Sequence, residues 1–192
     1  MGGGVLCVPC ERLAEETVMF WSGDNLRNFA QCTLVMQSRL QPKTLKKNQE
    51  KVFSAFLRAC GGTKKSNEAA LKALTWGEYP NVTVVRGLID GEDCGQWKPA
   101  FPNLVKITSY RITPLEECIQ YGVSQDVADN TRLFEGTLLH EIVHFVRYRA
   151  GLLDNDWDFP DTEEPGGQFE IWAYGELQCS RDSLFHSAAT YM

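Results

Sequence analysis

Two histidines and a glutamate lie close together in the run His140-Glu141-Ile142-Val143-His144. On an α-helix, residues i and i+4 lie one above the other, so both imidazoles can reach a single metal ion. Glu141 projects about 100° away around the helix, close enough for its carboxylate to reach a water molecule on that ion. The spacing therefore predicts a metal site, most simply one for Zn²⁺, with an acid beside it.

The helix that must carry these residues is predicted over 133–151. Apolar residues cover most of its circumference, which is typical of a buried helix. Asn130 or Thr131 can cap its start, and Gly151 can end it. Two histidines and an acid buried without partners would be costly, and a bound Zn²⁺ offsets that cost. The alternative is a hydrogen-bonded pair of core histidines with no metal.

The rest of the chain predicts an α+β fold, with helices around a small mixed or antiparallel sheet and a buried active-site helix. A length of 192 residues favours one domain, 1–192. Residues 1–80 are expected to be mainly helical, and residues 81–192 to hold the sheet, the active-site helix and a further helix. Helices are expected over 11–30, 44–60 (capped by Thr44), 66–74 (capped by Ser66) and 168–175, and strands over 82–89 and 104–112.

Composition narrows the function classes. The formal net charge is −6, which argues against nucleic-acid binding. The sequence has no apolar run of about 18 residues, so no membrane span is predicted. The amino end lacks the pattern of a secretory signal peptide. The seven cysteines fit either disulfides in an oxidising compartment or buried thiols, and the sequence leaves both interpretations open.

The run 140–144 resembles the HExxH motif of the zincin metallopeptidases. The resemblance implies that His140 and His144 are zinc ligands and that Glu141 is the general base for a zinc-bound water. Among the zincin branches, the metzincin pattern fails because Arg147 and Ala150 stand where its glycine and third histidine belong.

The gluzincin branch takes its third ligand from the next helix, which implies Glu170 here. The acids before that helix are the alternatives: Asp154, Asp156, Asp158, Glu163 and Glu164. Tyr174 follows Glu170 by four residues and is a candidate donor to the oxyanion, although a packing role is equally open. His186 is a second candidate donor. Zincins also bind their substrate along a strand, for which 104–112 is the expected segment.

From Glu135 to Gly175 the chain is similar to the metallopeptidase toxin domains of bacterial secretion effectors, including those fused to type VI spike proteins. This similarity implies a protein or peptide substrate, a secretion-system carrier or a cognate immunity protein as partner, and secretion without a signal peptide. It also implies action in a target cell, in the periplasm for example.

The expected function is therefore a zinc metallopeptidase. A zinc amidase acting on peptidoglycan is the second enzyme hypothesis. A non-catalytic binding domain stabilised by zinc, or a helical interaction domain without metal, is the alternative from a different class.

Overall fold

The computed structural model describes residues 28–75, 78–86, 94–122, 124–152 and 164–178. These residues form seven α-helices and three strands, which confirms the predicted α+β class. The helices are α2 (Ala30–Leu40), α3 (Pro42–Asn48), α4 (Glu50–Ala59), α5 (Lys64–Ala73), α6 (Ser109–Tyr121), α7 (Ser124–Ala150) and α8 (Pro165–Tyr174). The strands are β1 (Asn81–Val85), β2 (Gly95–Trp97) and β3 (Leu104–Thr108).

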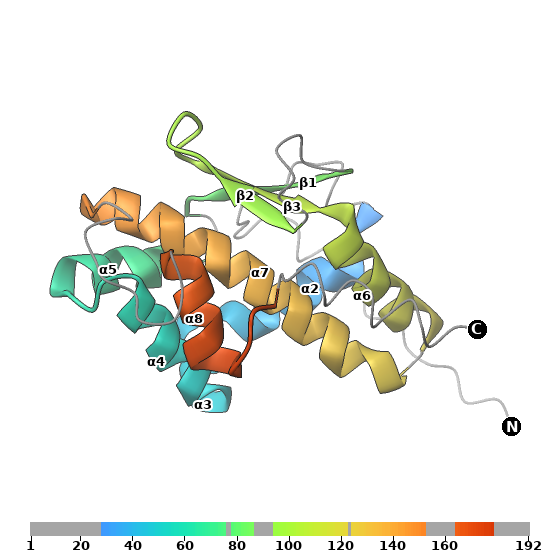
Figure 1. Cartoon of the computed structure of the whole chain (residues 1–192). Coiled ribbons are helices and arrows are strands. Elements are labelled where there is room, and N and C mark those ends of the chain that lie inside the picture. Colours follow the sequence, from blue (N-terminus) through green and yellow to red (C-terminus); the bar gives the residue numbers. More distant parts are fainter. Residues whose placement is uncertain (1–27, 76–77, 87–93, 123, 153–163, 179–192) are drawn as a thin grey trace, which may run out of the picture.

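The long helix α7 is the centre of the fold. Figure 1 shows the sheet on one side of α7, with α4, α5 and α8 gathered on the other side. Apolar side chains in the middle of α7 are fully buried, as the sequence predicts: Leu138, Leu139, Ile142, Val143 and Val146. A helix that buries most of its surface offers few positions to polar groups, so the buried polar groups that it does carry must find partners inside the protein.

Helix α7 begins earlier than the sequence indicates. It starts at Ser124, so Asn130 and Thr131 lie inside the helix and cap nothing. The reason is tertiary packing, because the first turns of α7 lie against α6. There Asn130 donates from Nδ2 to the sulfur of Cys118, at 3.4 Å, and the Thr131 side chain is buried.

The amino-terminal helices are close to the prediction but are divided differently. The expected helix 44–60 is two helices, α3 and α4, separated by Gln49. Helix α3 begins at Pro42 with Gln41 as its N-cap, so Thr44 lies inside the first turn and is not the cap. Helix α5 is capped by Thr63 instead of Ser66. The two hydroxyls form a capping box, in which each side chain accepts from the backbone N–H of the other residue. The expected helix 11–30 lies outside the described residues except for its last three positions.

The sheet is mixed. Its strand order is β1-β3-β2, in which β1 pairs with β3 in parallel and β2 pairs with β3 antiparallel. The predicted strand 104–112 ends at Thr108, because Arg111, Ile112 and Leu115 bury one face of α6 and so follow a helical period. The predicted strand 82–89 is β1, whose last residue is Val85; residues 87–93 are not described.

This strand order overturns one expectation. Strand β3 is hydrogen-bonded on both edges, so a peptide cannot add to it, and the prediction that substrate lies along 104–112 is wrong. Among the described strands, β2 is the edge strand that lies against α7. Of the helices that the structure describes, none is both long and apolar enough to cross a membrane.

The cysteines divide between the two interpretations. Cys32, Cys60 and Cys118 are free, and the first two are fully buried. Burial raises the pKa of both buried thiols well above its ordinary value, so they are apolar side chains in chemical terms. Cys94 is disulfide-bonded.

Candidate metal centre

Three side chains from two helices converge on one point. His140 and His144 project from α7, and Glu164 stands at the start of α8. The Glu164 carboxylate lies 2.9 Å from Nε2 of His144 and 3.5 Å from Nε2 of His140. One donor atom from each residue falls within 4.8 Å of the others. Ligands that surround Zn²⁺ tetrahedrally at 2.0–2.1 Å lie about 3.3 Å apart, so this arrangement is close to a zinc-binding geometry.

Glu164 is also the N-cap of α8. Its carboxylate accepts hydrogen bonds from the backbone N–H groups of Gly166, at 2.7 Å, and of Gly167. Burial by itself would raise the pKa of Glu164. The hydrogen bond to His144, the charges of both histidines and the Gly167 N–H more than reverse that effect and lower the pKa to about 2. The carboxylate is therefore ionised at neutral pH and can act as a metal ligand.

His140 is held from its other side by Glu170. Nδ1 of the imidazole lies 3.0 Å from Oε1 of this carboxylate, which is 1% exposed. An ionised carboxylate can only accept, so Nδ1 carries the proton and Nε2 is the nitrogen that faces Glu164. This is the arrangement in which a carboxylate behind a histidine fixes the ring of a metal ligand.

The electrostatic balance at His140 favours positive charge. Burial alone would lower the pKa of His140. The hydrogen bond that Nδ1 donates to Glu170 and the negative charges of Glu141, Glu164 and Glu170 outweigh that burial and raise the pKa of His140 to about 9. The field that holds a proton on this imidazole also favours a divalent cation beside it.

Glu141 lies next to the same point but is not one of the three convergent groups. Its Oε1 is 3.9 Å from Nε2 of His140, and the residue is 6% exposed. It packs against Gly95 at the start of β2, where a Cβ atom would lie 2.8 Å from both Cγ and Oε1 of Glu141. The absence of a side chain at position 95 gives the carboxylate the space that it occupies.

The glutamate that lies nearest the two histidine Nε2 atoms is Glu164, not the Glu170 that sequence analysis favours as the third ligand. The sequence favours Glu170 as the third ligand because apolar neighbours surround it, and it leaves Glu164 as one of several alternatives. In the structure Glu164 reaches both Nε2 atoms, and Glu170 contacts Nδ1 of His140. Proline is common in the first position of a helix, so Pro165 indicates that α8 starts there and that Glu164 is its N-cap.

Tyr174 lies one helical turn after Glu170, at the other end of α8 from Glu164. Its hydroxyl donates to Oε1 of Glu135, at 3.2 Å, and its ring packs edge-on against Phe169. Oε2 of Glu135 accepts in turn from Nε of Arg39, at 2.9 Å, and from Nε2 of Gln49, at 3.0 Å. Burial and the neighbouring Glu135 carboxylate raise the pKa of Tyr174 above its ordinary value. These contacts tie α2 and α4 to α7 and α8.

Aromatic rings border the histidines on the side of the sheet. Trp97, at the end of β2, lies parallel to the His144 ring with centroids 6.5 Å apart. Tyr148 follows His144 by one helical turn and is 45% exposed, and its ring is 5.2 Å from that of Trp97. Together they form an aromatic wall beside the convergent groups. The remaining sequence candidates, Asp154, Asp156, Asp158, Glu163 and His186, lie outside the described residues.

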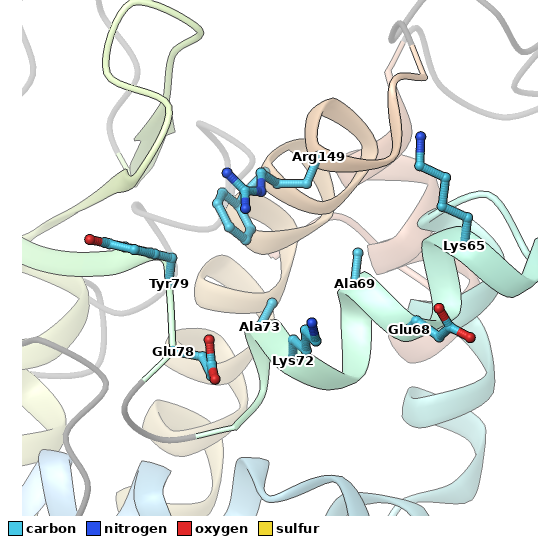
Figure 2. A pocket seen from close by; sticks show the side chains of 9 residues that line it. Lys65, Glu68, Ala69, Lys72, Ala73, Glu78, Tyr79 and Arg149 are labelled. Carbon is cyan, nitrogen blue, oxygen red and sulfur yellow. The ribbon is translucent and has the colours of Figure 1, made fainter.

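A separate groove runs between α5 and α7. It has a volume of about 230 Å³, and Figure 2 shows residues of α5 along one wall and Arg149 of α7 along the other. None of the convergent residues lines it. Its charged side chains are of both signs, namely Lys65, Glu68, Lys72, Glu78 and Arg149. It is therefore distinct from the metal-binding group.

Comparison with known proteins agrees with this chemistry. The family described as Metallopeptidase toxin 3 matches residues 26–175, and the chain belongs to this family. The protein is therefore a metallopeptidase toxin, and a peptidase of this kind works with a metal ion on a protein substrate. Neither the curated proteins nor the solved structures that were compared give a match.

The approach of α8 to α7 yields a first prediction. A Cβ atom on Gly166 would lie 2.4–2.6 Å from three atoms of the His140 ring. Gly166→Ala is therefore expected to displace the imidazole and to lower metal affinity by about tenfold or more. Metal content after dialysis against a buffered metal solution measures this effect. Metal content equal to that of the unmodified protein would show that the close approach does not matter for binding.

Tyr174 yields a second prediction. Because its hydroxyl donates a hydrogen bond to Glu135, Tyr174→Phe is expected to lower the free energy of unfolding by about 0.5–1.5 kcal/mol. The kcat of this variant is expected to stay within about twofold of that of the unmodified protein. Denaturant unfolding and peptidase assays measure the two quantities. If kcat instead fell by about a hundredfold or more with unchanged stability, which is the effect of deleting an oxyanion donor, the hydroxyl would be catalytic.

Proposed function

We propose that this toxin is a zinc-dependent endopeptidase in which His140, His144 and Glu164 bind the ion. The observation that carries the proposal is the convergence of one donor atom from each residue within 4.8 Å. The donor set is two imidazoles and one carboxylate, which is a common set for a catalytic zinc with an open position. Hard cations such as Mg²⁺ and Ca²⁺ prefer oxygen ligands, so the two imidazoles favour zinc.

Glu170 is proposed as the residue that orients His140, in place of the third-ligand role that the sequence favours. Two observations support this assignment. Its Oε1 contacts Nδ1, the nitrogen that faces away from Glu164, and its Oε2 accepts from the backbone N–H of Gln178 at 2.6 Å. Both oxygens are thus engaged on the far side of the ring.

Glu141 is proposed as the general base. Zinc bound in this group would lower the pKa of a water molecule and polarise the carbonyl of the scissile peptide bond. Glu141 accepts the proton from the attacking water and later delivers it to the leaving amine. Its place against Gly95 keeps its carboxylate beside Nε2 of His140, within reach of that water. A role for Tyr174 in packing, not in catalysis, is favoured by its hydrogen bond to Glu135.

The substrate is proposed to be a protein chain that lies along β2. This edge strand adjoins Glu141 through Gly95 and the aromatic wall through Trp97. An extended peptide that lay beside β2 would bring a substrate side chain to the aromatic wall. The amide of a peptidoglycan stem peptide remains the alternative substrate, and cell-wall digestion without cleavage of proteins would favour it.

Membership of a toxin family supports secretion and action in a target cell. We propose delivery by a secretion-system carrier, as the similarity to type VI effectors implies, and protection of the producing cell by an immunity protein. A non-catalytic role for the metal is less well supported, because the described group holds three ligands and a structural zinc needs four.

The general-base assignment predicts a clean loss of activity. Glu141→Gln keeps the shape of the side chain but accepts no proton, so kcat is expected to fall by about 10²–10⁴-fold while zinc content stays at one ion per chain. Peptidase assays and elemental analysis measure both quantities. The exposed Glu117→Gln is the matched control. Retained activity in Glu141→Gln would remove this residue from the mechanism.

The two glutamates of α8 predict different losses of zinc. Glu164→Ala removes a ligand and is expected to abolish stoichiometric zinc binding. Glu170→Gln retains a group that can contact Nδ1, so its zinc affinity is expected to fall by only about 10–100-fold. Titration of the apoprotein with zinc compares them, with Glu68→Ala as a control for loss of charge. Loss of binding in Glu170→Gln together with normal binding in Glu164→Ala would reverse the two roles.

A further inference from the structure

We propose that Cys94 forms a disulfide with Cys179, and that this bond holds Glu141 and Glu170 in place beside the convergent groups, so that the oxidised chain binds metal more tightly than the reduced chain. The pairing of the two cysteines is independent of the proposed function, whereas the effect of the disulfide on zinc binding rests on the proposed function. Cys94 is disulfide-bonded, and the residue is only 2% exposed. Because Cys32, Cys60 and Cys118 are free, the partner is Cys7, Cys10 or Cys179.

Arg111 selects among these three cysteines. This side chain is 7% exposed, and it directs Nε and Nη2 at the sulfur of Cys94, at 3.0 and 2.8 Å. The same Nη2 donates to the carbonyl of Gln178 at 3.0 Å. One nitrogen atom thus contacts both Cys94 and the residue that directly precedes Cys179 in the sequence. That proximity favours Cys179 as the partner, because a disulfide requires Cα atoms within about 7 Å of each other.

Each end of the proposed bond leads to a glutamate of the centre. Cys94 directly precedes Gly95, which packs against Glu141. The Cys94 carbonyl is itself fixed by the backbone N–H of Thr108, at 2.9 Å, and by its hydroxyl, at 3.1 Å. On the other side, the backbone N–H of Gln178 donates to Glu170 at 2.6 Å, and Glu170 contacts His140. The bond would therefore join β2, which supports Glu141, to the segment after α8, which supports Glu170.

The chemistry of the switch is thiol–disulfide exchange. Two thiols give up two protons and two electrons as the sulfur–sulfur bond forms, and a disulfide of a dithiol oxidoreductase takes them up and becomes a dithiol. In a reducing cytoplasm the equilibrium favours the thiols, and in an oxidising compartment it favours the bond. The toxin would thus be poorly assembled where it is made and complete where it acts.

Peptide mapping tests the pairing directly. The full-length protein is alkylated without reduction, digested and analysed by mass spectrometry. A single peptide linked through Cys94 and Cys179 is expected. A link from Cys94 to Cys7 or Cys10, or free Cys94 in protein purified under oxidising conditions, would overturn the proposal.

Thermal unfolding of the zinc-free protein tests the structural part. Reduction with a phosphine, which becomes the phosphine oxide with oxygen from water, is expected to lower Tm by roughly 5–15 °C. Cys94→Ser and Cys179→Ser should each reproduce this fall, and the double variant should be no less stable than either single variant. Cys118→Ser, which removes a free thiol, is the control. Equal Tm values for the oxidised and reduced protein would contradict the proposal.

Zinc titration tests the link to the metal centre. The reduced protein and both cysteine variants are expected to bind zinc about 10–100-fold more weakly than the oxidised protein, as for loss of groups that orient a ligand. Unchanged affinity would show that the bond does not support the site. Failure of the oxidised protein to bind zinc at all would instead refute the proposed function, and the mapping and Tm results would still decide the pairing.

Discussion

The contact between Nδ1 of His140 and the Glu170 carboxylate is the interaction on which the rest of the centre depends. It fixes which nitrogen carries the proton, and so it leaves Nε2 directed at Glu164. A free imidazole could rotate about its bond to Cβ, but this one is held between a nearly fully buried acid and the backbone of Gly166. The geometry of the three convergent groups, which could hold a metal ion, is thus set in part by residues outside that set.

The contact between His140 and Glu170 depends on the close packing of α8 against α7. Helix α8 has Gly166 near its start, which lets its backbone approach the His140 ring more closely than any other residue type would allow. Phe169 is fully buried between Phe56 of α4 and Tyr174, and this packing anchors α8 on the side away from the sheet. The sheet supplies the opposite border through Gly95 and Trp97. Helices and sheet together enclose a small set of charges that would be costly to bury without mutual compensation.

How much of this is predictable from the sequence depends on the range of the interactions involved. The active-site helix and its histidines follow from local periodicity, since a helix fixes where residues four apart must lie. The class of fold follows as well, because the strand-like segments lie together in the middle of the chain, between two groups of helical segments. The position of Glu164 is less accessible, because it depends on how α8 packs on α7. The apolar neighbours of Glu170 predict that it is buried, which the structure confirms, but they do not tell a metal ligand from the orienting residue that we propose.

The remaining errors have related causes. The segment after Thr108 carries both a β-branched pattern and a helical one, and the packing of Ile112 and Leu115 decides in favour of the helix. The state of Cys94 is beyond sequence analysis, because spacing alone does not reveal which cysteines meet. Asn130 and Thr131 are good capping residues by type, yet contacts with α6 extend α7 past them.

The double use of Glu164 has a consequence for the order of events in folding. The same carboxylate accepts hydrogen bonds from the first N–H groups of α8 and faces the two imidazoles. It therefore caps the helix and is also the proposed metal ligand. Its oxygens accept hydrogen bonds from the N–H groups of Gly166 and Gly167, so the entropy of immobilising them is lost when the helix forms. A newly made chain that has formed the first turn of α8 against α7 would therefore meet its cation with a ligand set that is preorganised.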